Sequence, residues 1–172
     1  MSIRRGASLF ARSTAGATAV EFAIVAPLFF ALTFSFFEAG WLMTRTILQD
    51  AAVSKVVREL KISSHTGVTA NDLKARICEA ALVFVQCEQA TMVEMIRLRN
   101  AADKIPNDSA ACVHRGEAPP FVPGDRSEFV FVRVCTSVTP ITPLLGFAVA
   151  LPDEGSDSYG IVTRAAFVNE PQ

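Results

Sequence analysis

The sequence predicts an α+β protein, in which an amino-terminal transmembrane helix continues into a long helix packed on a small antiparallel sheet. Three observations support this prediction. Residues 22–43 form a long apolar run, apolar residues with helical spacing follow it, and three segments with strand periodicity lie further along the chain. The chain has 172 residues and a net charge of -1, which suits one span and one small domain and offers no basic patch for nucleic acid.

The apolar run is predicted to cross a membrane. As a helix, residues 22–43 would measure about 33 Å, against about 30 Å for the hydrocarbon core of a bilayer. Between Glu21 and Arg45 the only charged residue is Glu38. We expect Glu21 and Glu38 to lie near the two interfaces, where their carboxylates can reach water, and Trp41 to act as an interfacial anchor.

A cleaved secretory signal is an alternative interpretation of this run. Such a signal has about 7 to 15 apolar residues and a small-x-small cleavage site. Here the run is longer, and Phe37 stands where a small residue is needed before Glu38 and Ala39. The sequence therefore favours a span over a secretory signal.

The charged flank predicts the orientation of the span. Arg4, Arg5 and Arg12 precede it with no acidic residue among them. Because basic segments stay on the cytoplasmic side, we expect a single-pass protein of the inner membrane with its amino terminus in the cytoplasm and its carboxy-terminal domain in the periplasm.

Glu21 is an ionisable residue at the start of the span, and such a residue is by default a functional one that needs a partner. It lies five positions after Gly16, which follows a short basic leader, and Phe22 comes next. This arrangement resembles the type IV prepilin signal. Residues 16–28, with Pro27, are similar to the TadE-like minor pilins or pseudopilins of the tight-adherence (Flp, type IVc) pilus, and residues 139–146 are also similar to a feature of that family.

The resemblance implies a pilin-like fold and a processing site. A prepilin peptidase would cleave after Gly16, so that Ala17 becomes the mature amino terminus. Glu21, with Phe22 beside it, would then pair with the amino terminus of a neighbouring subunit, and Pro27 would kink or loosen the first turns of the helix.

The resemblance also implies a function and partners. The chain would be a non-enzymatic subunit that assembles a tight-adherence pilus, and it would thereby serve surface adhesion and biofilm formation. The implied partners are the prepilin peptidase, the major pilin and other minor pilins, the inner-membrane assembly platform and membrane lipid. The protein could also lie within the pilus, as the alternative to the inner membrane.

The predicted organisation has four parts. Residues 1–16 form the cytoplasmic leader, residues 17–44 the transmembrane helix, residues 45–63 its extension, and residues 64–172 an extracytoplasmic, disulfide-bonded α+β domain.

Two helical patterns follow the span. In the extension, apolar residues recur every three to four positions, at Leu48, Ala52, Val53, Val56, Val57 and Leu60. This stripe indicates packing on the domain, with a helix contact in a filament as the alternative. A second helix is expected from a capping box at Thr69 and Asp72 to about Phe84, with Leu73, Ile77 and Ala81 on one face.

Strand periodicity appears in residues 91–99, 128–138 and 158–169. The connection between the first two, residues 100–127, is rich in Pro, Gly, Asp and Asn and is predicted to be a long loop. The connection over residues 140–155 is expected to form a short helix or a flap over the sheet.

The four cysteines, Cys78, Cys87, Cys112 and Cys135, all follow the span. An even number on the extracytoplasmic side indicates disulfides. Three connectivities exist, and we favour Cys78 with Cys87, joining the second helix to the first strand, and Cys112 with Cys135. The sequence has no C-x-x-C motif, and His65 and His114 are not at ligand spacings, so neither a metal nor another cofactor is expected.

Catalytic motifs are absent from the sequence. It contains no G-x-S-x-G, no glycine-rich phosphate loop and no H-E-x-x-H. Asp153, Glu154 and Asp157 miss the spacing of a calcium-binding loop and suit a solvated turn.

The alternative to a pilus assembly subunit is a membrane-tethered or secreted periplasmic hydrolase or binding protein that uses its amino terminus only as an anchor.

Overall fold

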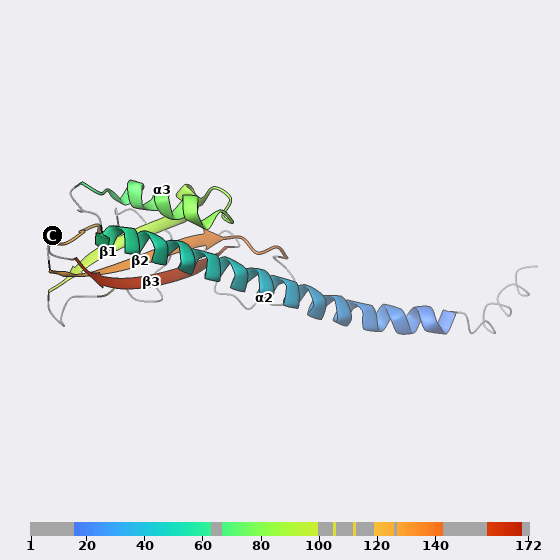
Figure 1. Ribbon diagram of the computed structural model, residues 1–172. Helices are drawn as coiled ribbons and strands as arrows, with labels where there is room; N and C mark the ends of the chain where they lie inside the picture. The colour runs from blue at the N-terminus through green and yellow to red at the C-terminus, as the bar shows by residue number, and fades with distance from the viewer. Residues whose placement is uncertain are drawn as a thin grey trace, which may run out of the picture.

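The computed structural model describes residues 16–62, 67–99, 105, 112, 119–125, 127–142 and 158–169. Its elements are α2 (Ala17–Ile62), α3 (Ala70–Ala81), α4 (Cys87–Ala90), β1 (Thr91–Leu98), β2 (Phe129–Val138) and β3 (Tyr159–Val168). Figure 1 shows α3 and the carboxyl-terminal half of α2 lying on the sheet, while the amino-terminal half of α2 projects beyond the domain. The predicted α+β architecture is confirmed.

Helix α2 is continuous. Its 46 residues correspond to a length of about 69 Å, and it passes through Pro27 without ending. The boundary that we placed between the span and its extension, at residues 44 and 45, therefore falls inside one uninterrupted helix. The segment expected to end the helix, residues 63–66, lies outside the described residues.

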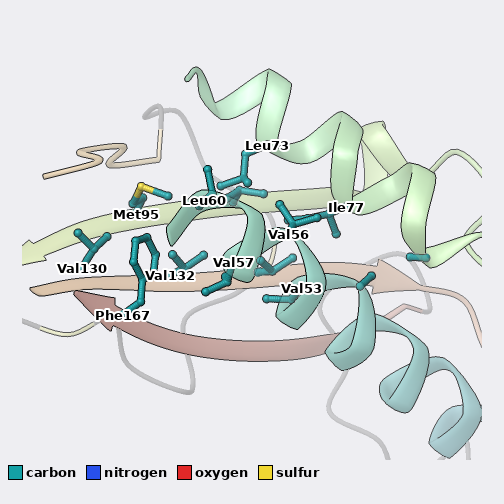
Figure 2. Close-up of a cluster of buried hydrophobic side chains, with 14 residues drawn as sticks. Val53, Val56, Val57, Leu60, Leu73, Ile77, Met95, Val130, Val132 and Phe167 are labelled. Atoms are coloured by element: carbon teal, nitrogen blue, oxygen red, sulfur yellow. The ribbon is translucent and has the colours of Figure 1, made fainter. Parts of the chain in front are cut away.

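The core lies between the two helices and one face of the sheet. Figure 2 shows Val53, Val56, Val57 and Leu60 of α2 in one cluster with Leu73 and Ile77 of α3 and with side chains of the strands, and Leu60 and Val56 lie beside Leu73 and Ile77. The predicted stripe on α2 is buried from Ala52 onward. Leu48, which we predicted to belong to this stripe, is 38% exposed. The next residue, Gln49, is buried in its place. Packing on the domain is thus the role of this half of α2.

Helix α3 begins with the predicted capping box. The hydroxyl of Thr69 accepts from the Asp72 N–H, and the Asp72 carboxylate accepts from the Thr69 hydroxyl and N–H. These hydrogen bonds lower the pKa of Asp72 below its usual value, and the bond from the Thr69 hydroxyl has the larger effect. The helix ends at Ala81 and not near Phe84 as predicted, because Leu82 adopts a left-handed conformation with φ of 41°.

The three strands form an antiparallel sheet in the order β1-β2-β3. Each predicted strand agrees with the structure to within one residue at either end. Part of the connection that we predicted as a loop adds to the outer edge of β1. The Met95 N–H donates to the Pro120 carbonyl at 2.9 Å, and the Val122 N–H donates to the Met95 carbonyl at 2.8 Å.

A buried ion pair joins β1 to β2 on the sheet face opposite the helices. Glu94 and Arg133 are paired in register, with 2.8 Å between the Glu94 Oε2 and the Arg133 Nη1 atoms. The Arg133 side chain is fully buried, so its charge depends on this carboxylate for compensation. Met92, Cys112 and Cys135 form a small apolar cluster beside it.

All four cysteines are bonded, as Cys78–Cys87 and Cys112–Cys135, with Cα–Cα distances of 5.6 and 5.2 Å. These are the pairings that the sequence analysis favoured. One detail differs: Cys87 lies in α4, before β1, so the first bond joins α3 to this short helix and not to a strand. The second bond holds Cys112 against β2.

We predict that the native protein has no reactive thiol. Alkylation without a reductant, followed by mass spectrometry, should add no label, because both pairs are oxidised. The control is the same protein reduced and denatured, which should take up four labels. Two or more labelled cysteines in unreduced protein from an oxidising compartment would contradict the prediction.

Candidate functional site on the long helix

The amino-terminal half of α2 is an exposed apolar surface. All of its large apolar side chains are between 39 and 77% exposed, namely Val20, Phe22, Ile24, Val25, Leu28, Phe29, Phe30, Leu32, Phe34, Phe36 and Phe37. An 18-residue window of α2 has a mean hydropathy of 2.0, and none of it is buried in the protein. A helix that is apolar on every side and uncovered by its own domain suits a bilayer or the apolar helices of other subunits.

The residues expected at the processing site lie at the start of this surface. Helix α2 begins at Ala17, directly after Gly16, so the peptide bond between them is at the end of the helix. Glu21 and Phe22 follow within the second turn, and both are exposed. Within the described part of the chain, the Glu21 carboxylate has no ion-pair partner.

Glu38 ends the exposed stretch and turns into the domain. Its side chain is 1% exposed. The Glu38 Oε2 atom accepts from the Ile141 N–H at 2.9 Å, from the Thr142 N–H at 3.1 Å and from the Thr142 hydroxyl at 3.3 Å. One carboxylate thus ties the helix to the segment that follows β2.

Arg45, two turns further on, makes a second contact with the same segment. The Arg45 Nη1 atom donates to the Thr139 carbonyl at 3.1 Å, and its guanidinium carbon lies 5.2 Å from the centre of the Trp41 ring. Tyr159, at the start of β3, lies beside it. Burial raises the pKa of Tyr159 above its usual value, while the nearby Arg45 acts in the opposite direction.

A third contact fixes α2 to the middle of the sheet. The Gln49 Nε2 atom lies 3.3 Å from the Val134 carbonyl of β2 and 3.0 Å from the Ile161 carbonyl of β3. It also lies 3.2 Å from the hydroxyl of Thr163, which donates to Asp50 at 2.5 Å. Because Gln49 is fully buried, these acceptors replace the water that its NH2 group loses on folding.

Residues 16–54 match the model of a protein family described as TadE-like protein. This part of the chain is TadE-like. Its match to the family indicates a role associated with assembly of the Tad pilus, and proteins of the TadE-like family are generally non-enzymatic. No curated protein and no solved structure matches the chain.

The TadE-like segment includes both the exposed start of α2 and its first contacts with the domain. It begins at the expected processing site, includes Glu21 and Phe22, and extends past Glu38 and Gln49 into the buried stripe. The segment thus covers the exposed half of the helix and the contacts by which the helix enters the domain.

The carboxylate of Glu38 does not reach water as we expected, and the role of Gln49 was not predicted. We expected Glu38 to lie near the membrane interface with its carboxylate reaching water, but the side chain is buried and its Oε2 atom accepts from the backbone N–H groups of Ile141 and Thr142. No local signal indicates this pairing, because the partners lie 103 and 104 residues further along the chain. The sequence did contain a signal for Gln49. It lies one turn before Val53, on the helix face that Val53, Val56 and Leu60 share, so a polar side chain could be expected among buried ones there.

Several other sequence features lie outside the described residues. They are the predicted leader up to residue 15, His65, His114, most of the 100–127 connection, and residues 143–157, which hold most of the predicted short helix or flap and the predicted solvated turn of Asp153, Glu154 and Asp157. Among the residues that are described, no group of three or more His, Cys, Asp or Glu side chains could hold a metal ion.

We predict that Glu38→Ala destabilises the domain by about 2 to 3 kcal/mol, because it leaves two backbone N–H groups without their charged acceptor. Denaturant unfolding of the full chain in detergent would measure this change. The fluorescence of Trp41 is a suitable probe because this single Trp lies one turn from Glu38. Glu79→Ala, which removes an exposed carboxylate from α3, is the control and should change stability by less than about 0.5 kcal/mol. Equal stability of the two variants would contradict the assigned role of Glu38.

Proposed function

We propose that this chain is a non-enzymatic minor pilin or pseudopilin that takes part in assembling a tight-adherence (Flp, type IVc) pilus, and through it in surface adhesion and biofilm formation. One observation carries the proposal. An uncovered apolar helix begins directly after Gly16 and holds Glu21 in its second turn, all within the TadE-like segment.

The proposed processing step is hydrolysis of the Gly16–Ala17 peptide bond by a prepilin peptidase. Water cleaves the bond, the leader leaves with a carboxylate at Gly16, and Ala17 acquires a free α-amino group. At neutral pH this group is largely protonated. It therefore supplies a positive charge at the end of the helix that carries Glu21.

The proposed assembly step pairs that charge with a carboxylate. Glu21 of one subunit lies among apolar side chains, where an unpaired charge is costly and a paired one is tolerated. The α-amino group of a neighbouring subunit would be its partner, and the Phe-rich surface of α2 would pack against the helices of that neighbour. The major pilin and other minor pilins are the proposed neighbours.

The proposed location is the inner membrane, with the leader in the cytoplasm and the domain in the periplasm. The candidate span of α2 supports a single-pass protein, and the two disulfides support an oxidising compartment for the domain. In this setting the prepilin peptidase would act from the cytoplasmic side, and the assembly platform and membrane lipid would surround the span.

We predict that the mature protein begins at Ala17. Mass spectrometry of the amino terminus in cells with an active prepilin peptidase should show this start, and Gly16→Val should leave the uncleaved form in the membrane. Ala23→Val, further along the same helix, is the matched control and should be cleaved normally. An intact Met1 or Ser2 start in wild-type protein would rule out the pilin assignment.

We predict that Glu21→Leu abolishes pilus assembly while membrane insertion is kept. The neighbour's α-amino group would then be buried without its counter-charge, at a cost of about 3 to 5 kcal/mol in a dry site. Glu21→Gln tests the charge alone and should behave in the same way, whereas Glu79→Leu, on the exposed face of α3, should assemble normally.

The readouts are pilus production and surface attachment in a strain that carries only the variant, at wild-type abundance. Cleavage after Gly16 is scored separately, so that an assembly defect is not confused with a processing defect. Wild-type piliation by Glu21→Leu would show that α2 is a plain hydrophobic anchor.

A further inference from the structure

We infer that the loop closed by the Cys78–Cys87 disulfide rests on the outer surface of the bilayer that α2 crosses. Leu82 and Val85 would be its lipid contacts, and the domain would thus meet the membrane at a second place beside its helix. This inference rests on the proposed membrane span of α2 but not on the role in a pilus.

Leu82 and Val85 are the most exposed large apolar side chains of the described residues, at 89 and 87%. They exceed even the Phe residues on the projecting half of α2, where the highest exposure is 77%. Two such side chains within four positions form an apolar tip that the domain itself leaves uncovered.

The backbone of the loop and its contacts with the domain keep Leu82 and Val85 at the surface. Leu82 and Gln86 both have left-handed backbones, with φ of 41° and 52°. The Cys78–Cys87 disulfide closes the loop at its base, and Phe84, which is partly buried, packs against Val138, Tyr159 and Ile161. The exposed pair is thus carried on a supported turn.

The loop lies at the end of the domain from which the apolar half of α2 emerges. Figure 1 shows the connection from α3 to β1, the end of β2 and the start of β3 together at this end. Leu42 of α2 packs against the same cluster as Phe84, and Arg45 of α2 lines the same surface pocket as Val85. The loop therefore lies beside residues 42–45 of the helix.

Residues 42–45 lie about 6 to 10 Å beyond Glu38 along α2, so this level begins in the headgroup layer of a bilayer and ends at its outer surface. Residues 17–37, the exposed stretch that ends before Glu38, measure about 31 Å as a helix, close to the hydrocarbon thickness of about 30 Å. Leu42 lies about 6 Å beyond Glu38, and the headgroup layer is about 5 to 7 Å thick on each side. Ile141, which is 59% exposed and donates to Glu38, lies at the hydrocarbon boundary itself.

The charges around the loop indicate an apolar contact. Glu79 and Glu88 flank the loop and are both exposed, while Arg45 lines the same surface pocket as Val85, so the loop has charges of both signs around it and no net attraction for anionic headgroups. Contact through Leu82 and Val85 requires no lipid charge. Neutral phosphatidylcholine should therefore be a sufficient partner.

Tryptophan quenching by brominated lipid tests this inference on the full chain. In a Trp41→Phe background, which removes the single Trp, Val85→Trp reports on the loop. Phe129→Trp is the matched control, since Phe129 is 60% exposed at the opposite end of the sheet, and Phe30→Trp reports on the span. Leu82→Trp is a second loop reporter if Val85→Trp does not fold. Each variant is reconstituted into phosphatidylcholine vesicles brominated either near the headgroup or deep in the acyl chain.

We expect lipid brominated near the headgroup to quench Val85→Trp at least twofold more than Phe129→Trp, and deep bromines to quench Phe30→Trp most strongly. Addition of anionic lipid should leave the quenching of Val85→Trp unchanged. If Phe30→Trp is quenched and Val85→Trp is not, α2 crosses the bilayer but the loop does not contact it, and this inference is wrong. Shielding of Val85→Trp from aqueous iodide without lipid quenching would show that protein covers the loop, which also overturns the inference. Absence of quenching at Phe30→Trp would overturn the span itself.

Discussion

The packing of the carboxyl-terminal half of α2 against the sheet is the interaction on which the rest of the structure depends. Val53, Val56 and Leu60 are at most 2% exposed, and each buried aliphatic side chain contributes about 1.5 to 3 kcal/mol. The helix is therefore not an anchor joined to a separate domain. It supplies part of the core, so the same element is the apolar surface at one end and the foundation of the domain at the other.

Apolar packing alone would permit a helix to shift along or rotate on a sheet, and polar contacts remove that freedom. Glu38, Gln49 and Asp50 each bond to a defined group of the segment after β2 or of the strands. Hydrogen bonds depend on direction and distance, and a buried polar group left without them costs about 1 to 3 kcal/mol. These three residues thus fix where along its length α2 enters the domain.

The elements of the fold could be predicted from the sequence because their signals are local. Period-two alternation located the three strands, and the capping box located the start of α3. Contacts between distant segments could not be predicted in this way: the docking of Glu38 on Ile141 and the pairing of Val122 with Met95 leave no local pattern. The end of α3 at Ala81 was missed because a leucine, here Leu82, rarely adopts the left-handed backbone that ends the helix. For the candidate site, the sequence indicated Gly16, Ala17, Glu21 and Phe22, and the structure adds that they begin an uncovered helix.

The continuity of α2 has a consequence for how the two ends of the protein are oriented. No break in the helix separates Glu21 from the buried stripe, so the direction in which Glu21 points is coupled to the face that the domain presents. One residue inserted or deleted between Phe37 and Gln49 would turn the two ends by about 100° relative to each other and change their separation by about 1.5 Å. The number of residues in this stretch, and not only their apolar character, therefore sets which side of the domain faces a neighbour bound at the amino-terminal end.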